Sequence, residues 1–273
     1  MTKPRLAPAP GVSGLATPAR PLAGKRIVVT RPQAQAAALC EMIRAAGGIP
    51  VCFPTIAIEP LADHAALDAA LARLAEFDLA VFVSANAVAA ALARLRGAWP
   101  AQVAAGATGP GTAQALERCG VARVILPARQ FDSEGLLQEL DARGISPKSV
   151  MIIKGEGGRD WLADTLRARG AAVTALPAYR RVRAQAEPSI IGDPARAGTL
   201  GGVVVSSSEG GVHLLAMLGE AALDWLNRAP VFVPHERIAA HLRARGLTQV
   251  VLTDGGDAGL IAGMSAHFAV VPA

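Results

Sequence analysis

The sequence of 273 residues has few aromatic residues, few cysteines and no long apolar run, and each shortage excludes a class of function. Phe, Trp and Tyr make up 4% of the chain and no lysine-rich tract occurs, which disfavours a surface that binds DNA or RNA by stacking on bases. Cys40, Cys52 and Cys119 lack the paired spacing of a zinc site, so we interpret them as buried thiols in a reducing cytosol and expect no metal. No segment reaches the ~18 to 20 apolar residues that cross a bilayer, so we expect a soluble, cytoplasmic protein.

The known glycine motifs for nucleotides are also missing. A dinucleotide-binding loop requires glycine at its first, third and sixth positions, but the run that begins Gly155-Glu156-Gly157 has Asp160 at the sixth. No Gly-Lys-Ser or Gly-Lys-Thr sequence occurs, and residues 106–112 have the wrong order of glycines. We therefore expect no nucleotide cofactor.

The residues that are abundant are small, apolar or basic. Hydrophobic residues, chiefly Ala, Val and Leu, make up 52% of the chain, which suits helices packed on parallel sheets in two domains of ordinary size. The net charge of +5 favours an acidic partner. Residues 1–23 are rich in Pro and Ala without a continuous apolar segment, which predicts a flexible tail rather than a signal peptide.

The most informative feature is an internal repeat with a constant offset of 123 residues. The repeat matches Lys25-Arg26-Ile27-Val28-Val29-Thr30-Arg31 with Lys148-Ser149-Val150-Met151-Ile152-Ile153-Lys154, Gly47 with Gly170, Pro54 with Pro177 and Ser84 with Ser207. Two half-chains therefore follow one plan. A duplicated lobe with a cleft between the copies is an architecture that holds ligands.

Short β-branched runs alternate with Ala- and Leu-rich helical patterns in both halves. The predicted strands are 27–30, 49–53, 79–83, 102–105 and 123–126 in the first half, and 150–153, 172–176, 203–205, 231–233 and 249–252 in the second. Apolar runs without polar alternation are typical of strands covered on both faces, so we predict an α/β fold with a five-stranded parallel sheet in each lobe. Apolar residues spaced three to four apart predict a helix between Arg31 and Gly47, which the second copy repeats from Asp160 to Arg169.

The division between the two lobes stays open at this point. A split near Ser146 would place each repeat in its own lobe. Residues 56–60 and 178–182, however, also look like extended connectors, and each ends a strand–helix–strand opening. Sequence periodicity does not choose between the two divisions.

Loops at the carboxyl ends of the predicted strands are where a ligand would bind. They are 30–32, 84–86, 108–112, 154–159, 206–209 and 234–237, and each carries hydroxyl groups, glycines or cations. Backbone N–H groups at helix starts attract anions, and an arginine beside them can hold a carboxylate by two hydrogen bonds. These loops predict an anionic ligand.

Ser84, Thr112 and Ser207 lie in these loops or at the helix starts that follow them. None stands in a Gly-x-Ser-x-Gly elbow or beside a spaced His–acid pair, so we favour helix capping over nucleophilic catalysis. A cap at a ligand-facing helix start still presents its hydroxyl group. The five histidines have no metal-like spacing, and we expect structural or surface roles for them.

Tyr179 is the only tyrosine of the chain and follows Pro177 at the end of a predicted strand. Two roles remain open for it. A phenol projecting into a cleft can donate a proton or a hydrogen bond to a departing hydroxyl group. Alternatively, the ring anchors the connector and leaves its hydroxyl in water.

Seven motifs, in order, resemble the uroporphyrinogen-III synthase family from about Gly24 to the C-terminus. They are Val29-Thr30-Arg31-Pro32, Phe82-Val83-Ser84-Ala85-Asn86-Ala87-Val88, Gly109-Pro110-Gly111-Thr112-Ala113, Ser133-Glu134-Gly135-Leu136-Leu137, Lys154-Gly155-Glu156-Gly157-Gly158-Arg159, Ala178-Tyr179-Arg180-Arg181 and Val205-Ser206-Ser207-Ser208-Glu209. The resemblance implies two flavodoxin-like, doubly wound lobes joined by two crossing connectors. It implies that residues 24–57 and 181–273 form one lobe and residues 58–180 the other, with the cleft between them.

The resemblance also implies an enzyme of tetrapyrrole and heme biosynthesis. It would cyclise hydroxymethylbilane to uroporphyrinogen III through a spiro intermediate, with loss of water, inversion of the last pyrrole ring and no cofactor. Tyr179 would assist loss of the hydroxyl group, and the polycarboxylate substrate would contact Arg31, Ser84, Thr112, Lys154, Arg159, Ser207 and Arg237. The sequence departs from the family pattern at one place: the second half has His235-Glu236-Arg237-Ile238 where a Gly-x-x-Thr loop is expected. Arg237 would therefore replace the hydroxyl contact that the threonine would make.

The family resemblance further implies a monomer that contacts the preceding enzyme of the pathway only transiently. A hypothesis from another class is a non-catalytic two-lobed protein that binds or senses a small anion, because such proteins also have crossing connectors and a hinged cleft. It predicts closure on a ligand without turnover.

Overall fold

The computed structural model describes residues 20–219 and 222–270. Contacts divide these residues into two compact units: unit 1 combines residues 20–55 with the described residues after Gln185, and unit 2 is Ile56–Gln185. The chain is therefore not divided near Ser146. None of the helices in the described ranges combines the length and apolar character of a membrane span.

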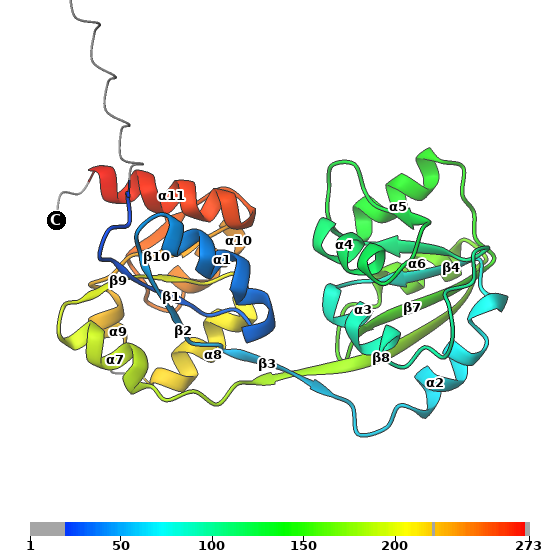
Figure 1. Ribbon diagram of the computed structural model, residues 1–273, viewed down its shortest axis with the longest axis horizontal. Helices are drawn as coiled ribbons and strands as arrows, with labels where there is room; N and C mark the ends of the chain where they lie inside the picture. Colours follow the sequence, from blue (N-terminus) through cyan, green and yellow to red (C-terminus); the bar gives the residue numbers. More distant parts are fainter. Residues whose placement is uncertain (1–19, 220–221, 271–273) are drawn as a thin grey trace, which may run out of the picture. The chain divides into compact units, whose positions relative to one another are not determined.

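Unit 1 contains a sheet of five parallel strands in the order β11-β10-β9-β1-β2 (Figure 1). The strands are β1 (Arg26–Val29), β2 (Ile49–Cys52), β9 (Leu200–Val204), β10 (Val231–Val233) and β11 (Val250–Leu252). The helices are α1 (Gln33–Ala45), α7 (Ser189–Arg196), α8 (Ser208–Leu218), α9 (Ala222–Leu226), α10 (Glu236–Arg243) and α11 (Gly256–Val270).

Helices cover both faces of this sheet. Successive side chains of a strand point to opposite faces, so neighbouring residues of β1 belong to different clusters. Ile27 and Val29 of β1 pack in a cluster with residues of α1 and α11, whereas Val28 packs in a cluster with residues of α7, α8, α9 and α10. Leu22 is fully buried in the first cluster, and its N–H donates to the Ala46 carbonyl at 3.0 Å. Leu22 thus belongs to the core and not to the tail predicted over 1–23, of which residues 1–19 lie outside the described ranges.

Unit 2 contains a sheet of six strands in the order β3-β8-β7-β4-β5-β6, in which only β3 runs antiparallel. The strands are β3 (Ile56–Pro60), β4 (Leu79–Phe82), β5 (Ala104–Ala107), β6 (Val124–Ile125), β7 (Ser149–Gly155) and β8 (Ala172–Arg183). The helical segments are α2 (Ala65–Ala72), the 3₁₀ turn η1 (Leu74–Glu76), α3 (Ala85–Leu92), α4 (Pro110–Arg118), α5 (Ser133–Ala142) and α6 (Trp161–Ala168).

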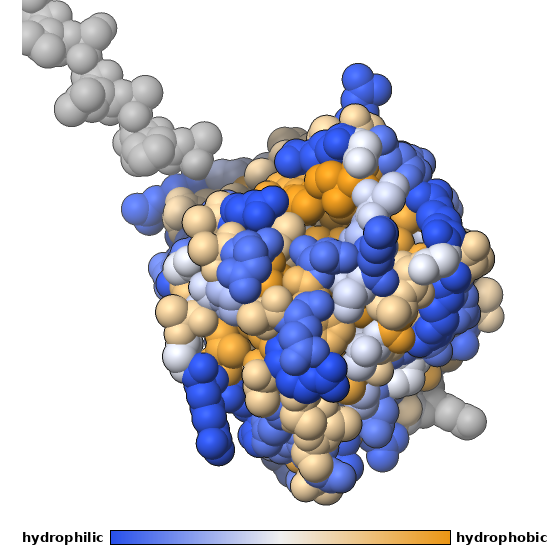
Figure 2. All heavy atoms as spheres, turned by 90° about the vertical axis from the view of Figure 1, so that its right-hand side faces the viewer, coloured by the Kyte–Doolittle hydropathy of each residue, from blue (hydrophilic) through white to orange (hydrophobic). Residues whose placement is uncertain are grey.

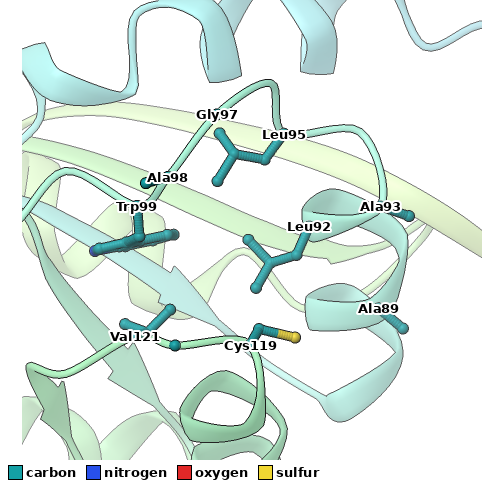
Figure 3. Close-up of a pocket in the computed structure, with 10 residues that line it drawn as sticks. Ala89, Leu92, Ala93, Leu95, Gly97, Ala98, Trp99, Cys119 and Val121 are labelled. Carbon is teal, nitrogen blue, oxygen red and sulfur yellow. The ribbon is translucent and has the colours of Figure 1, made fainter.

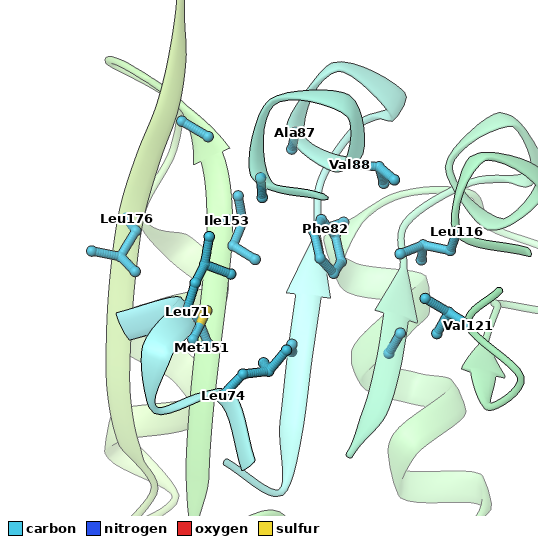
Figure 4. Close-up of a cluster of buried hydrophobic side chains, with 14 of the residues drawn as sticks. Leu71, Leu74, Phe82, Ala87, Val88, Leu116, Val121, Met151, Ile153 and Leu176 are labelled. Atoms are coloured by element: carbon cyan, nitrogen blue, oxygen red, sulfur yellow. The ribbon is translucent and has the colours of Figure 1, made fainter. Parts of the chain in front are cut away.

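The core of unit 2 likewise lies on both faces of its sheet. Figure 4 shows one cluster, in which Phe82, Met151 and Ile153 of the sheet meet residues of α2, α3 and α4. Val81 and Ile152 belong to the cluster on the other face, together with residues of α5 and α6. This two-sided burial explains the continuous apolar runs in the sequence.

The two repeats exchange strands between the units. The first repeat supplies β1 and β2 to unit 1 but β4, β5 and β6 to unit 2, and the second supplies β7 and β8 to unit 2 but β9, β10 and β11 to unit 1. In Figure 1 the blue β1 and β2 accordingly share a sheet with the yellow-to-orange β9 and β10. The parallel strands of both sheets follow one order, β2-β1-β9-β10-β11 and β8-β7-β4-β5-β6.

The α/β fold with parallel sheets is confirmed, but the expectation of five strands in each lobe is wrong for unit 2. Residues 56–60, expected as a connector, pair with residues 179–183 and add β3 as a sixth strand. Since β3 and β8 hold each other along this length, the contacts keep residues 56–57 and 181–183 in unit 2, whereas the family resemblance assigns them to the other lobe.

Asp132 caps helix α5 and gives a pH-dependent contribution to stability. Its carboxylate accepts hydrogen bonds from the Gly135 N–H and the Gln130 side-chain amide, each at 2.8 Å. Burial raises the pKa of this carboxyl group, but the hydrogen bonds from Gln130, Gly135 and the Glu134 N–H, together with the positive charge of Arg159, leave the pKa below its usual value. A lowered pKa stabilises the fold at pH values above the unfolded pKa, and the stabilisation is lost as the pH falls through the folded pKa.

We expect Asp132→Ala to lower the free energy of unfolding by about 1 kcal/mol at neutral pH, because the cap is lost. The difference from the wild type should shrink below pH ~4. Urea unfolding of both proteins at neutral and acidic pH measures this. Asp132→Asn is the matched control, since an amide still caps without titrating. An Asp132→Asn protein as stable as the wild type at neutral pH would contradict a role for the charge.

Candidate functional site

The residues predicted to bind a ligand lie at or beyond the carboxyl ends of the parallel strands in each unit. In unit 2 they form two groups, one around Tyr179 and one around Lys154. In unit 1 they gather around Arg31 and at the starts of α8 and α10. The residues of each group come from the ends of these strands and from the loops and helix starts that follow them.

Tyr179, Ser84 and Gly155 form a tyrosine cluster in unit 2. Tyr179 lies in β8 with 3% of its surface exposed, and its hydroxyl group is 3.0 Å from Ser84 Oγ. A Cβ atom on Gly155 would lie 2.9 Å from the phenol Cζ atom, so the ring occupies the space that any other residue would fill. The phenol is thus buried in unit 2, and its hydroxyl group is within hydrogen-bond distance of a side chain, that of Ser84.

The position of Tyr179 follows from strand pairing on both sides of β8. Its Cα atom is paired with Gly155 of β7 and with Pro60 of β3, and the β7 register shifts between Lys154 and Gly155. The Glu156 N–H donates to the Tyr179 carbonyl at 2.8 Å. The backbone around the phenol is therefore fixed by two neighbouring strands.

Ser84 is the N-cap of α3, since its Oγ accepts a hydrogen bond from the Ala87 N–H at 3.1 Å. Its repeat counterpart Ser207 caps α8 in the same way through the Gly210 N–H at 3.0 Å. Both serines therefore cap a helix, the role that the sequence favours for them. A serine hydroxyl has one proton and two lone pairs. If Ser84 accepts from Ala87 and from Tyr179, its proton is left for a third partner.

Lys154 and Arg159, the two candidate cations of unit 2, are each paired with a carboxylate of the same unit. Lys154 Nζ donates to the Gly158 carbonyl at 2.9 Å and to Asp160 Oδ1 at 2.5 Å. The hydrogen bond from Lys154 lowers the pKa of the Asp160 carboxyl group. Arg159, whose side chain is 69% exposed, donates to Glu134 Oε1 at 2.9 Å.

Thr112 lies in the first turn of α4 and is 5% exposed. Gly109 is the N-cap of this helix and Pro110 occupies its first turn, which suits the start of a helix. The structure thus places Thr112 at a helix start of the carboxyl edge, as predicted, but within the buried set of residues.

Arg31, a candidate cation of unit 1, is held by two side chains. It follows β1, its side chain is 18% exposed, and it donates from Nε to Ser206 Oγ at 2.8 Å and from Nη1 to Asp257 Oδ1 at 2.5 Å. The loop beneath it is held by Thr30 Oγ1, which donates to the Val204 carbonyl at 2.8 Å. Asp257 and Ser206 therefore hold the guanidinium group at the strand edge.

Arg237 is exposed in the first turn of α10. The N-cap of this helix is His235, whose Nδ1 accepts from the Arg237 N–H at 3.0 Å. The residue at the place of Thr112 is Ile238, which is 4% exposed and part of the core. The structure thus places an apolar side chain at the hydroxyl position and a cation beside it.

Sequence reasoning missed Asp257, the carboxylate that pairs with Arg31 across 226 positions of the chain. The repeat contained a signal for it, because Ser133-Glu134-Gly135-Leu136 resembles Asp257-Ala258-Gly259-Leu260, and both segments lie at the start of a helix that follows an edge strand.

The interpretation of the cysteines as buried thiols is wrong for Cys52 and Cys119, which are exposed. Cys52 ends the edge strand β2, where no further strand of the described residues covers it.

Two cavities of unit 2 lie away from these strand ends. One of about 510 Å³ is bordered by Leu92, Trp99 and Cys119 at the carboxyl-terminal ends of α3 and α4 (Figure 3). Another, of about 680 Å³, is bordered by Asp68, Arg94 and other residues of α2 and the segment after α3. The space-filling view in Figure 2 shows apolar patches interrupted by hydrophilic side chains on one face of the molecule.

The arrangement is chemically suited to a ligand with several carboxylates. Arg31 in unit 1 and Lys154 and Arg159 in unit 2 are each paired with a carboxylate of the protein. A ligand carboxylate can take the place of that partner at the cation, and the displaced protein carboxylate is then hydrated by solvent. Tyr179 and Ser84 supply adjacent hydroxyl groups for proton transfer. Within residues 20–219 and 222–270, no group of three or more His, Cys, Asp or Glu side chains is placed to hold a metal ion.

Comparison with known proteins gives one consistent family. Residues 37–260 match the model of the family described as uroporphyrinogen-III synthase HemD. The chain is 32% identical over 237 residues to the uroporphyrinogen-III synthase of Escherichia coli K12, a match that covers 85% of this chain and 96% of that protein. The uroporphyrinogen-III synthase of Salmonella typhimurium is 32% identical over 238 residues, with the same two coverages of 85% and 96%.

Solved structures show the same fold at lower identity. A mutant uroporphyrinogen III synthase from Thermus thermophilus has a TM-score of 0.57 and 19% identity, and the match covers 89% of this chain and 97% of that one. The enzyme from Helicobacter pylori has a TM-score of 0.56 and 15% identity, with coverages of 90% and 98%.

Proposed function

Since this chain belongs to the uroporphyrinogen-III synthase family, we propose that it cyclises hydroxymethylbilane to uroporphyrinogen III, with loss of water and inversion of the last pyrrole ring. The observation that carries the proposal is the family match over residues 37–260, within which the tyrosine cluster lies whole. The alternative of a non-catalytic anion sensor is not favoured, because the relatives that match most of the chain are named as synthases.

The proposal includes the finer features that the family resemblance implies. Each unit is a doubly wound sheet of the flavodoxin type, a conclusion supported by the strand order β2-β1-β9-β10-β11 and its counterpart β8-β7-β4-β5-β6. The protein acts as a cytoplasmic monomer that meets the preceding enzyme of the pathway only transiently.

Tyr179 and Ser84 act together in the loss of water. The Tyr179 phenol donates to Ser84 Oγ, and the serine proton passes to the hydroxyl group that leaves the first ring, which generates an azafulvene. A relay through Ser84 is required because only 3% of Tyr179 is exposed, whereas Ser84 is partly exposed. The last ring then attacks through its substituted carbon, and the resulting spiro intermediate fragments and recloses.

Substrate carboxylates bind to the cations at the strand edges. Arg31, Lys154 and Arg159 exchange their protein carboxylates for those of the substrate, and Arg237 binds at the start of α10. Ser207 and Thr112 contribute hydroxyl groups at the starts of α8 and α4. Positioning matters here because the bilane also closes without an enzyme, but to the symmetric isomer.

The product isomer tests the activity. Purified protein is supplied with hydroxymethylbilane generated enzymatically, and the oxidised uroporphyrin isomers are separated by chromatography. We expect the type III isomer to dominate and to rise with protein concentration. Type I product alone, at the rate seen without the protein, would contradict the proposed activity.

We expect Arg31→Met to raise KM about 10- to 100-fold with a smaller change in kcat, because it removes a cation that binds substrate before and during the reaction. Steady-state kinetics of type III formation measures this. Arg44→Met is the control, since Arg44 lies in α1 and pairs with Glu41 in an exposed i,i+3 bridge. Equal KM values for the wild type and Arg31→Met would remove Arg31 from the substrate contacts.

A further inference from the structure

Cys40 and Cys52 lie together in unit 1, with 3.6 Å between their Sγ atoms. Cys40 belongs to the inward stripe of α1, is 3% exposed and packs in the same cluster as Ile27 and Val29. Cys52 is the last residue of the edge strand β2 and is exposed. Since Val51 packs toward the opposite face, alternation along the strand turns Cys52 toward α1.

The other repeat shows that this pair is not required for packing. At the constant offset of the repeat, Cys40 corresponds to Ala163 and Cys52 to Ala175. Ala163 is 3% exposed in α6, and Ala175 packs against the same cluster of unit 2. The two positions therefore need only small side chains, and thiols occur together in one copy alone.

We propose that Cys40 and Cys52 form a dithiol that small-molecule disulfides, such as oxidised glutathione, convert reversibly to an intramolecular disulfide. The proposal is independent of the synthase activity, because neither thiol belongs to the proposed site. Disulfide formation requires the two sulfur atoms to approach to about 2.05 Å, a modest displacement from contact distance.

The two thiols differ in access, and this sets the order of steps. The exposed Cys52, as thiolate, attacks one sulfur of the small disulfide, forms a mixed disulfide and releases one small thiolate. Burial, followed by the hydrogen bond with Cys52, raises the pKa of the Cys40 thiol to about 11, so Cys40 is a poor first nucleophile. Cys40 then gives its proton to the released thiolate, attacks Cys52 Sγ and expels the second small thiolate. The two protein thiols lose two electrons, and the small disulfide gains them.

The test exposes the full-length protein to oxidised glutathione, blocks remaining thiols with an alkylating reagent and maps the products by mass spectrometry. We expect the wild type to lose two hydrogens and to yield a linked pair of peptides that contain Cys40 and Cys52. Cys40→Ala should stop at the glutathione adduct on Cys52, and dithiothreitol should reverse both products. Cys40→Ala places at this position the residue found at Ala163 in the other repeat, so the variant is expected to fold.

Cys119→Ser is the matched control, because Cys119 is also exposed but has no thiol partner among the described residues. It should form the Cys40–Cys52 link as readily as the wild type. The disulfide should also raise the melting temperature of unit 1 by about 5 °C, since it closes a short loop. Accumulation of the Cys52 adduct in the wild type to the level seen in Cys40→Ala would overturn the proposal, as would a link through Cys119.

Discussion

Replacing Gly135 with alanine is expected to lower the free energy of unfolding by about 3 kcal/mol, the largest loss of stability that we predict from a single added methyl group. An ideal Cβ atom at this position lies 1.8 Å from the carbonyl oxygen of Gln130, which is backbone and cannot rotate away. The Gly135 N–H also donates to the capping carboxylate of Asp132 at 2.8 Å. The segment 130–135 must therefore shift, and the cap of α5 is weakened with it.

Gly259 provides an independent check in unit 1. Its Cβ atom would lie 2.4 Å from the Asp254 carbonyl oxygen, five residues earlier, as Gln130 lies five residues before Gly135. We expect Gly259→Ala to cost a comparable amount for the same reason. Gly111→Ala is the control, because Gly111 also lies in the first turn of a helix, but a Cβ atom there would meet none of the described atoms within 4 Å. Urea unfolding compares the three variants, and a loss below ~0.5 kcal/mol for Gly135→Ala would refute the steric argument.

Replacing Tyr179 with phenylalanine is expected to lower kcat for type III product about 100-fold. Phenylalanine keeps the ring against Gly155 and removes only the hydroxyl group that contacts Ser84. The stability loss should stay near ~1 kcal/mol, the usual contribution of one hydrogen bond. Kinetics and urea unfolding of the same preparations separate the two effects. An unchanged kcat would assign the phenol to structure alone.

The relay makes a second, sharper prediction for the same pair. If Tyr179 acts through Ser84, Ser84→Ala should lower kcat about as much as Tyr179→Phe, and the double variant should be little slower than either single variant. Asp132→Ala is the control for capping, because it loses the N-cap bond to the Gly135 N–H but Asp132 is not among the proposed site residues. Additive losses in the double variant would instead mean that the two hydroxyl groups act independently.

Local features of the fold could be predicted from the sequence because they depend on neighbouring residues. The strand at 231–233 was predicted with the bounds that the structure gives it, and Ser84 and Ser207 cap the helices that follow them. The repeat also predicted matching strands in both halves. The sixth strand was missed, since residues 56–60 become a strand only by pairing with residues 179–183, far along the chain.

The sequence by itself determined the α/β class, the duplicated plan and the loops that carry the candidate residues, because apolar periodicity and helix capping act within a few residues. Only the tertiary structure decided that residues 56–60 and 179–183 pair as strands of one sheet, and which side chains meet. It brings Tyr179 to Ser84 across 95 positions and Arg31 to Asp257 across 226. Such contacts depend on which strands pair and in which register. Pairing and register are set when the whole sheet forms, and they produce no periodic pattern in the sequence that could predict them.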